Sequence, residues 1–215
     1  ARWIYAAETR RLIRFERRAL DAAVAGILVS ETERRLLANL QPDGADKLLV
    51  ITNGVAADCF GVIPNPNVQP AIVFCGRMDY EPNIDGVEWF VREILPKVRE
   101  RRPDAVFRIV GAAPAARVLA LRATPGVEVT GTVPDVRPYL AGAAVVVAPL
   151  RIARGIQNKV LEGLAAGRPV VATPDALDGI AARPGRDVLV GADAQGFATA
   201  VADAERGESR VTPSL

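Results

Sequence analysis

The sequence of 215 residues has no histidine, two cysteines and only 5% aromatic residues. Cys59 and Cys75 suggest neither a disulfide framework nor a zinc site, and a thiol at the end of the apolar run 71–75 behaves as a small buried hydrophobe. No apolar run approaches the roughly 20 residues that span a bilayer. The net charge is only +2, so no global field indicates a nucleic acid as partner.

The remaining composition is that of an aliphatic-cored α/β protein, with 50% hydrophobic and 24% charged residues. The length allows one full domain and part of another, but not two complete α/β lobes. The chain begins Ala1-Arg2-Trp3, with neither an initiator methionine nor a signal-peptide hydrophobic region. We therefore expect a cytoplasmic protein that is part of a longer chain.

The first third of the chain differs from the rest in its pattern of charged and apolar residues. Its pattern predicts helices over residues 2–20 and 31–40 and strands over 25–29 and 48–52, and Ser30 is a plausible N-cap for the second helix. Three prolines in residues 61–70 indicate an interdomain linker. We therefore predict a first domain over residues 1–66 and a second over 67–215.

From residue 71 onward, short apolar runs alternate with helical segments. Such alternation predicts an α/β fold, a Rossmann-like parallel sheet with flanking helices and right-handed crossovers. Pro96 predicts a kink or break in a helix over 84–101. The predicted strands are 71–75, 106–110, 127–129, 144–148, 170–172 and 188–190, and the other helices are 115–122, 135–141, 159–166 and 197–204.

In open parallel sheets, ligands bind in the loops that follow the strands. For two of these loops, both a ligand-binding role and a purely structural role fit the sequence. In the loop 75–83, Gly76 allows close backbone approach and Arg77 could pair with a diphosphate. The alternative is an ion pair of Arg77 with Asp79 or Glu81. In the loop 131–135, backbone groups beside an apolar wall could hold a flat base, or Pro134 could merely start a helix.

A third loop, residues 151–158, precedes a short helix and is more informative. The free backbone N–H groups of residues 155–158 would make an anion site at the helix N-terminus. Glu162, one turn inside the helix, could accept hydrogen bonds from both hydroxyls of a ribose. Lys159 shares its face, although the two could equally form a surface pair that contributes about 0.2–0.5 kcal/mol.

Taken in order, these motifs resemble the retaining GT-B glycosyltransferases of family four. The resemblance covers nearly all of residues 25–190. The runs 77–85 and 149–159 resemble the branch of sugar transferases associated with exopolysaccharide and PEP-CTERM/exosortase loci. The motifs are Ile51-Thr52-Asn53-Gly54-Val55, Phe74-Cys75-Gly76-Arg77-Met78, Ile109-Val110-Gly111, Val129-Thr130-Gly131-Thr132-Val133 and the run from Lys159 to Thr173.

The resemblance implies the C-terminal, donor-binding lobe of a GT-B fold behind a remnant of the acceptor-binding lobe. It makes Glu162 the ribose carboxylate, Arg77 a phosphate ligand, and Val133-Pro134 the base-contacting edge. Further donor contacts are implied at Gly76, Gly111, Gly155, Ile156, Gln157 and Asn158. Two positions depart from the family pattern: Arg154 replaces a glutamate, and Pro82-Asn83 replaces a phosphate-binding lysine. We expect Lys159 or Arg154 to supply the missing positive charge.

The implied reaction is retaining transfer of a hexosyl group from a nucleoside diphosphate sugar to a hydroxyl acceptor, without a cofactor or an obligatory metal. Arg77 and Lys159 are the candidates to stabilise the departing diphosphate. The resemblance also implies polysaccharide or glycolipid synthesis, with an acceptor that can be lipid-linked. Because the chain has no histidine, no acceptor-orienting histidine is present, and we expect donor binding without useful turnover.

Three alternatives remain open at this stage. A sugar-nucleotide epimerase would bind the same donor, and a non-catalytic nucleotide-binding module is compatible with arginine at position 154. The arginine-rich helix 2–20 could dock peripherally on the inner face of a membrane. A solvated charged face is the commoner explanation of such a run, and we favour it.

Overall fold

The computed structural model describes residues 2–61, 69–153 and 155–205. The chain divides into two compact units, residues 1–53 and 54–215, and each is described by itself. None of the helices in these described ranges is both long enough and apolar enough to cross a membrane.

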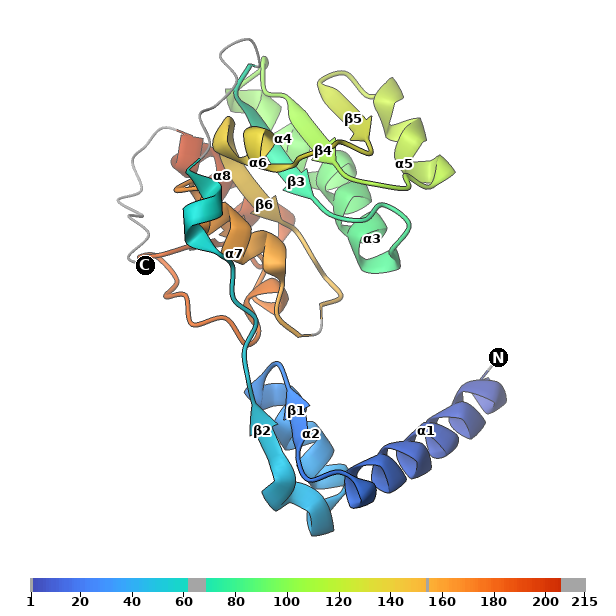
Figure 1. The fold of residues 1–215 in the computed structure, drawn as a ribbon. Coiled ribbons are helices and arrows are strands. Elements are labelled where there is room, and N and C mark those ends of the chain that lie inside the picture. Colours follow the sequence, from blue (N-terminus) through green and yellow to red (C-terminus); the bar gives the residue numbers. More distant parts are fainter. Residues whose placement is uncertain (1, 62–68, 154, 206–215) are drawn as a thin grey trace. The chain divides into compact units, whose positions relative to one another are not determined.

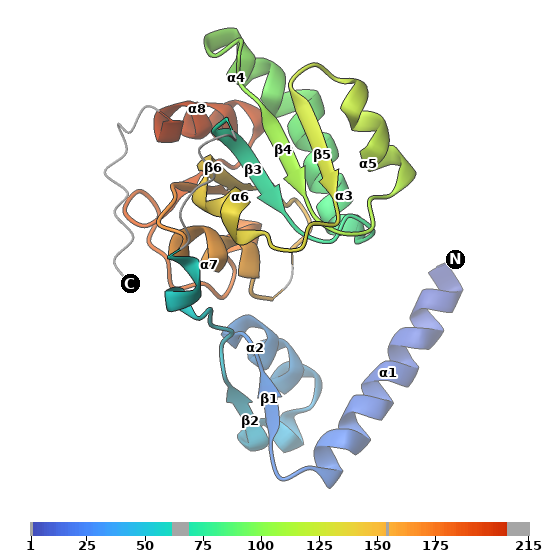
Figure 2. The ribbon, with the colours of Figure 1, turned by 45° about the horizontal axis from the view of Figure 1, so that its top comes forward.

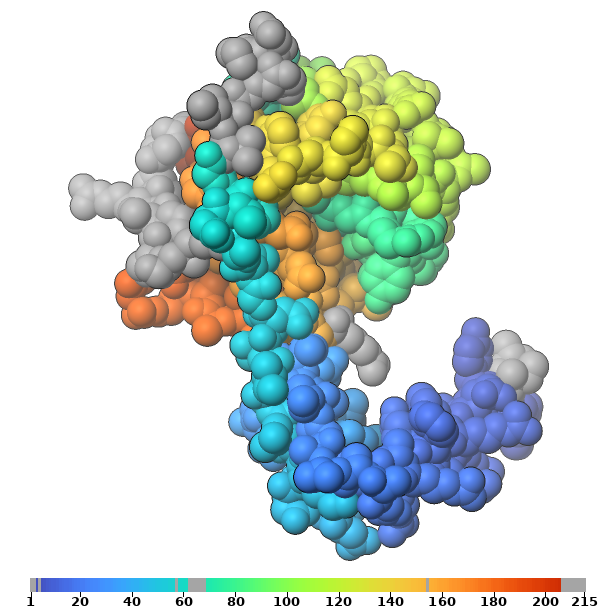
Figure 3. Space-filling view, in the orientation of Figure 1, coloured from blue at the N-terminus to red at the C-terminus, as the bar shows by residue number. Residues whose placement is uncertain are grey.

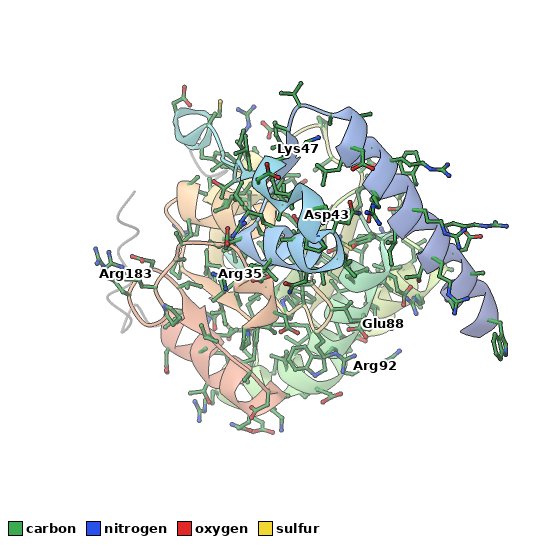
Figure 4. All side chains as sticks on the ribbon, turned by 90° about the horizontal axis from the view of Figure 1, so that it is seen from below. Arg35, Asp43, Lys47, Glu88, Arg92 and Arg183 are labelled. Atoms are coloured by element: carbon green, nitrogen blue, oxygen red, sulfur yellow. The ribbon has the colours of Figure 1, made fainter. Side chains whose placement is uncertain are left out.

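The first unit is a small α/β arrangement in which β1 and β2 pair in parallel, Gly26 opposite Leu48. Ser30 caps α2 as predicted, because its hydroxyl accepts a hydrogen bond from the backbone N–H of Glu33 at 3.2 Å. Lys47 (labelled in Figure 4) donates to carbonyl oxygens at the end of α1, including that of Leu20 at 3.1 Å. The elements are α1 (Arg2–Ala22), β1 (Gly26–Leu28), α2 (Glu31–Leu40), a 3₁₀ helix (Pro42–Lys47) and β2 (Leu48–Val50).

The division between the units lies at residues 53 and 54, earlier than the predicted boundary between 66 and 67. The segment after it packs with the second unit: Phe60 contacts the hydrophobic core, and Arg137 Nη1 donates to the carbonyl oxygen of Cys59 at 3.2 Å. This segment contains a 3₁₀ helix, η2 (Ala57–Phe60). Residues 62–68 of the predicted linker lie outside the described residues.

The second unit contains a six-stranded sheet in the order β5-β4-β3-β6-β7-β8, with every neighbouring pair parallel. The predicted fold class, a parallel sheet with flanking helices, is therefore confirmed (Figure 1). The strands are β3 (Ala71–Cys75), β4 (Phe107–Val110), β5 (Val127–Gly131), β6 (Ala143–Ala148), β7 (Val170–Ala172) and β8 (Leu189–Val190). The helices are α3 (Glu81–Trp89), α4 (Leu95–Arg101), α5 (Ala116–Ala120), α6 (Arg137–Ala141), α7 (Asn158–Ala165) and α8 (Ala194–Glu205).

Helices cover both faces of this sheet, which explains why its central strands are continuous apolar runs. The long helix pair α3 and α4 lies on one face, and α6 and α7 lie on the other (Figure 1). α8 returns to pack beside α4 (Figure 2). The aromatic rings of Phe90 and Phe107 stack with centroids 4.1 Å apart, and Phe197 of α8 meets Phe90 edge-on at 6.1 Å. All three side chains are fully buried.

The break predicted at Pro96 is present. Helix α3 passes into one π-helical turn, Phe90–Ile94, in which the N–H of Leu95 donates to the carbonyl of Phe90. Pro96 then occupies the first turn of α4, where its missing N–H removes no intrahelical hydrogen bond. The helix therefore continues on the far side of the proline with a shifted register.

The strand order fixes where a ligand can bind. The chain moves outward from β3 to β4 and β5, and then crosses back to β6 on the other side of β3. The loops that leave β3 and β6 consequently run in opposite directions and leave a crevice at the carboxyl ends of these strands. The binding loops predicted after residues 75 and 150 both lie there.

Candidate functional site

A cavity of about 420 Å³ opens at the carboxyl ends of β3 and β6. Its lining comes from the β3–α3 loop, the β4–α5 loop, the start of α6 and the first turns of α7. In the space-filling view, residues of α7 (orange) reach the surface between the segment of η2 (cyan) and the β3–α3 region (green) (Figure 3). The lining residues are Cys75, Gly76, Arg77, Ala112, Val136, Ile156, Asn158, Lys159 and Glu162.

Short backbone contacts hold the β3–α3 and β4–α5 loops together. The N–H of Gly76 donates to the carbonyl of Val110 at 3.0 Å, and that of Met78 donates to the carbonyl of Ala112 at 2.9 Å. Buried Asn83 donates from Nδ2 to the carbonyl of Arg77 at 2.8 Å. Asn83, one of the two residues at which the chain departs from the pattern of the family it resembles, therefore has a structural role: it fixes the turn that presents Arg77.

Arg77 lines the cavity and also forms the ion pair that was the alternative to ligand binding. Its Nε and Nη2 donate to the two carboxylate oxygens of Asp79 at 3.0 and 2.6 Å. The guanidinium is exposed, and the pairing with Asp79 raises its pKa. Water screens such an exposed pair, which therefore contributes little to stability, so a diphosphate could compete for this guanidinium at small cost.

The opposite side of the cavity is the N-terminus of α7. Gln157 is the N-cap residue, and its side chain makes no capping hydrogen bond to the helix. The first N–H groups of a helix have no intrahelical acceptor, and together with the helix dipole they favour an anion. Asn158 and Lys159, the first two residues of the helix, both line the cavity.

Lys159 is partly buried, and it is not the surface partner of Glu162. Its Nζ donates to Gln157 Oε1 at 3.1 Å and lies 5.5 Å from the centroid of the Phe74 ring. Burial lowers the pKa of Lys159 from its ordinary 10.5 to about 8, with the negative charge of Glu162 opposing this change. The lysine is therefore a cation held in an apolar surrounding, where its attraction for an anionic ligand is weakly screened.

Glu162 lies one turn further along the same helix and faces the same cavity. Burial raises the pKa of its carboxyl, with Lys159 acting in the opposite direction. Among the described residues, no side chain donates a hydrogen bond to it, so its oxygens remain available as acceptors. Cys75 forms part of the cavity wall, and burial raises the pKa of its thiol to about 12.

The structure brings together about half of the predicted donor contacts. Gly76, Arg77, Ile156, Asn158, Lys159 and Glu162 line the cavity. Five others lie in the adjoining loops outside its lining: Gly111, Val133, Pro134, Gly155 and Gln157. Arg154 lies outside the described residues.

Sequence reasoning missed Cys75, Ala112 and Val136 as lining residues. Each is within three residues of a predicted position, and each is an apolar or small side chain with no chemical signal of its own. Cys75 was interpreted as a buried hydrophobe, and the last residue of a parallel strand is where the chain turns into a binding loop.

No group of three or more cysteine, aspartate or glutamate side chains within residues 2–61, 69–153 and 155–205 is arranged to hold a metal ion. The cavity instead offers Arg77, Lys159 and a helix N-terminus as its positive groups. Charge stabilisation by these groups without a metal stays a prediction.

Comparison with known proteins assigns the family. A family model described as glycosyl transferases group 1 matches residues 69–205. The chain belongs to this family. The match spans both sides of the cavity, from the strand before Arg77 to the helix after β8. A search of curated protein sequences gave no match.

Solved glycosyltransferase structures share the fold of this group 1 chain. Anabaena HepE, in complex with UDP and glucose, is 14% identical with a TM-score of 0.72, covering 94% of this chain and 60% of that one. The sucrose-phosphate synthase of Thermosynechococcus elongatus is 21% identical with a TM-score of 0.72, covering 96% and 55%. The chain thus spans less than two thirds of the length of either protein.

Proposed function

We propose that the second unit is the donor lobe of a glycosyltransferase and binds a nucleoside diphosphate sugar whose nucleotide is UDP. One observation carries the proposal. The cavity at the switch point of the sheet combines a helix N-terminus, the partly buried ammonium of Lys159 and the open carboxylate of Glu162. The structure of Anabaena HepE with UDP supports the choice of uracil as the base.

Each of these groups matches one part of the donor. The diphosphate would lie against the N-terminus of α7, with Lys159 and Arg77 as its cations. The ribose hydroxyls would donate to Glu162, and the base would contact the apolar lining near Val136. Val133 and Pro134, implied by the family pattern as the base-contacting edge, lie in the loop just before this residue.

In the reaction we propose, a hexosyl group leaves the nucleoside diphosphate and joins a hydroxyl of the acceptor. The bond from the anomeric carbon to the diphosphate oxygen breaks, and that oxygen gains negative charge. Fixed cations and helix-terminal N–H groups stabilise this charge without reorganisation. Retention of configuration and a role in polysaccharide or glycolipid synthesis are predictions that rest on the sequence resemblance. Peripheral membrane contact of the arginine-rich helix stays the less favoured alternative to a solvated face.

Titration with nucleotides tests the donor site directly. We expect the chain to bind UDP and UDP-glucose more tightly than GDP or uridine by calorimetry. Glu162→Ala should weaken UDP binding about 10–100-fold, because hydrogen bonds to a charged group contribute about 1.5–3 kcal/mol each. Glu100→Ala, a change at an exposed position of α4, is the matched control and should bind like the wild type.

The outcomes separate the possible errors. A folded wild type that binds none of these ligands would overturn the proposed function. Equal UDP affinity in the wild type and in Glu162→Ala would leave a nucleotide site but remove the ribose role of Glu162. Tighter binding of GDP than of UDP would show that the base is guanine.

A further inference from the structure

The segment between β6 and α7 determines where the ammonium of Lys159 lies. It has no regular secondary structure over residues 149–153 and 155–157, and it leads directly into the first turn of α7. At its start, the N–H of Leu150 donates to the carbonyl of Ala148 at 2.9 Å, and the Thr173 hydroxyl donates to the carbonyl of Leu150 at 2.5 Å. Side-chain contacts further along the segment add to these.

The strongest such contact joins Arg151 to Asp85 of α3. Arg151 Nη2 donates to Asp85 Oδ1 at 2.6 Å and Nε donates to Oδ2 at 3.1 Å, which is a two-point interaction. The guanidinium also lies 5.4 Å from the ring centroid of Trp89. The Asp85 side chain is 23% exposed, so this pair is more shielded from water than the Arg77–Asp79 pair.

The backbone beside Asp85 is in direct contact with the same segment. A β-carbon at Gly86 would lie 2.8 Å from the carbonyl oxygen of Pro149, so any larger residue there would push α3 and the segment apart. Two residues before Asp85, Asn83 holds the carbonyl of Arg77. The first two turns of α3 thus contact the Arg77 loop through Asn83 and the start of the β6–α7 segment, which leads to Lys159, through Asp85 and Gly86.

We propose that Asp85 is a positioning residue for diphosphate binding. Through Arg151 it fixes the β6–α7 segment, and so it sets the place of Lys159 and of the α7 N-terminus relative to Arg77. Asp85 does not line the cavity, so its effect is indirect. The inference rests on the proposed nucleotide-binding function and gives Asp85 a role in it.

Binding of UDP and of uridine to a small set of variants tests this role. Asp85→Asn and Arg151→Gln should each weaken UDP binding about 3- to 10-fold, with uridine affinity changed less than about twofold. The double variant should lose no more than either single one, because both remove the same contact. Asp85→Glu keeps the charge and should recover most of the loss. A purely structural defect would instead weaken both ligands alike.

The control is Asp104→Asn, which removes a more exposed aspartate–arginine contact, to Arg102 Nε at 3.3 Å. This pair lies in the turn before β4, at the opposite end of the sheet, so UDP binding should be unchanged. Hydrogen exchange without ligand supplies a second measurement. Amides of residues 150–153 and 155–157 should exchange faster in Asp85→Asn and Arg151→Gln than in the control.

Two results would overturn the positioning role while leaving the donor site intact. One is an unchanged ratio of UDP to uridine affinity in both single variants. The other is additive losses in the double variant. A wild type that binds neither ligand would overturn the proposed function itself, and the exchange data would still report whether the ion pair holds the segment.

Discussion

Gly111 packs so closely against Gly76 that a β-carbon at position 111 would overlap the carbonyl oxygen of Gly76. Its φ of +152° is also one that residues with a side chain rarely adopt. The two glycines directly follow the neighbouring strands β3 and β4, and their contact brings the β3–α3 and β4–α5 loops together at the cavity.

Replacement of Gly111 by alanine should therefore lower the free energy of unfolding of the second unit by about 1–3 kcal/mol, from overpacking and backbone strain. Urea denaturation would measure the loss. Gly54→Ala is the control, since a β-carbon there meets no atom within 4 Å. An equal effect at both positions would contradict the proposed importance of the contact.

The affinity for UDP should fall as the pH rises above about 8. Lys159 in the free protein has its pKa lowered to about 8 by burial, and an adjacent diphosphate would raise that pKa again. Above pH 8 binding must then take up a proton, so affinity falls by up to about tenfold per pH unit. Calorimetry between pH 7 and 10 would show this in the wild type and not in Lys159→Met. Both titrations share the ionisation of the base, so their difference isolates the lysine; identical profiles would count against its contact with phosphate.

Removal of the same lysine should stabilise the protein without ligand. Between pH 8 and the ordinary 10.5, the unfolded chain binds more protons than the folded one, so the free energy of unfolding rises with pH in this range. Below pH 8 the full burial cost is present. Lys159→Met should therefore raise the free energy of unfolding at pH 7 by about 1–3 kcal/mol. Lys97→Met on α4 serves as the control, and a destabilised Lys159→Met would show that the ammonium is held favourably.

Gln41 is a candidate for stabilisation of the first unit. Its side chain is buried, and neither amide atom has a hydrogen-bond partner among the described residues. A buried polar group without a partner costs about 1–3 kcal/mol, so Gln41→Met should raise the melting temperature of this unit. Asn39→Leu, an exposed change on α2, is the control. A loss of stability in Gln41→Met would indicate that the amide is paired in solution.

The sequence by itself determined the elements and their class. The strands β3 and β7 have the predicted bounds because each is a short apolar run that ends at a turn residue, and α2 begins where Ser30 predicts. The alternation of strands and helices along the sequence was sufficient to predict a parallel sheet. The family motifs predicted that Arg77, Lys159 and Glu162 lie at one site, and all three line the same cavity.

Only the tertiary structure decided how those residues are held. The Asp85–Arg151 ion pair joins residues far apart in the chain, and no local pattern specifies which of many arginines meets which aspartate. The division at residues 53 and 54 has the same origin, since Phe60 packs on a core assembled from distant strands. The pKa of Lys159 likewise depends on the burial that Phe74 and its neighbours create. Local chemistry sets secondary structure, whereas burial and long-range pairing exist only once the chain has folded.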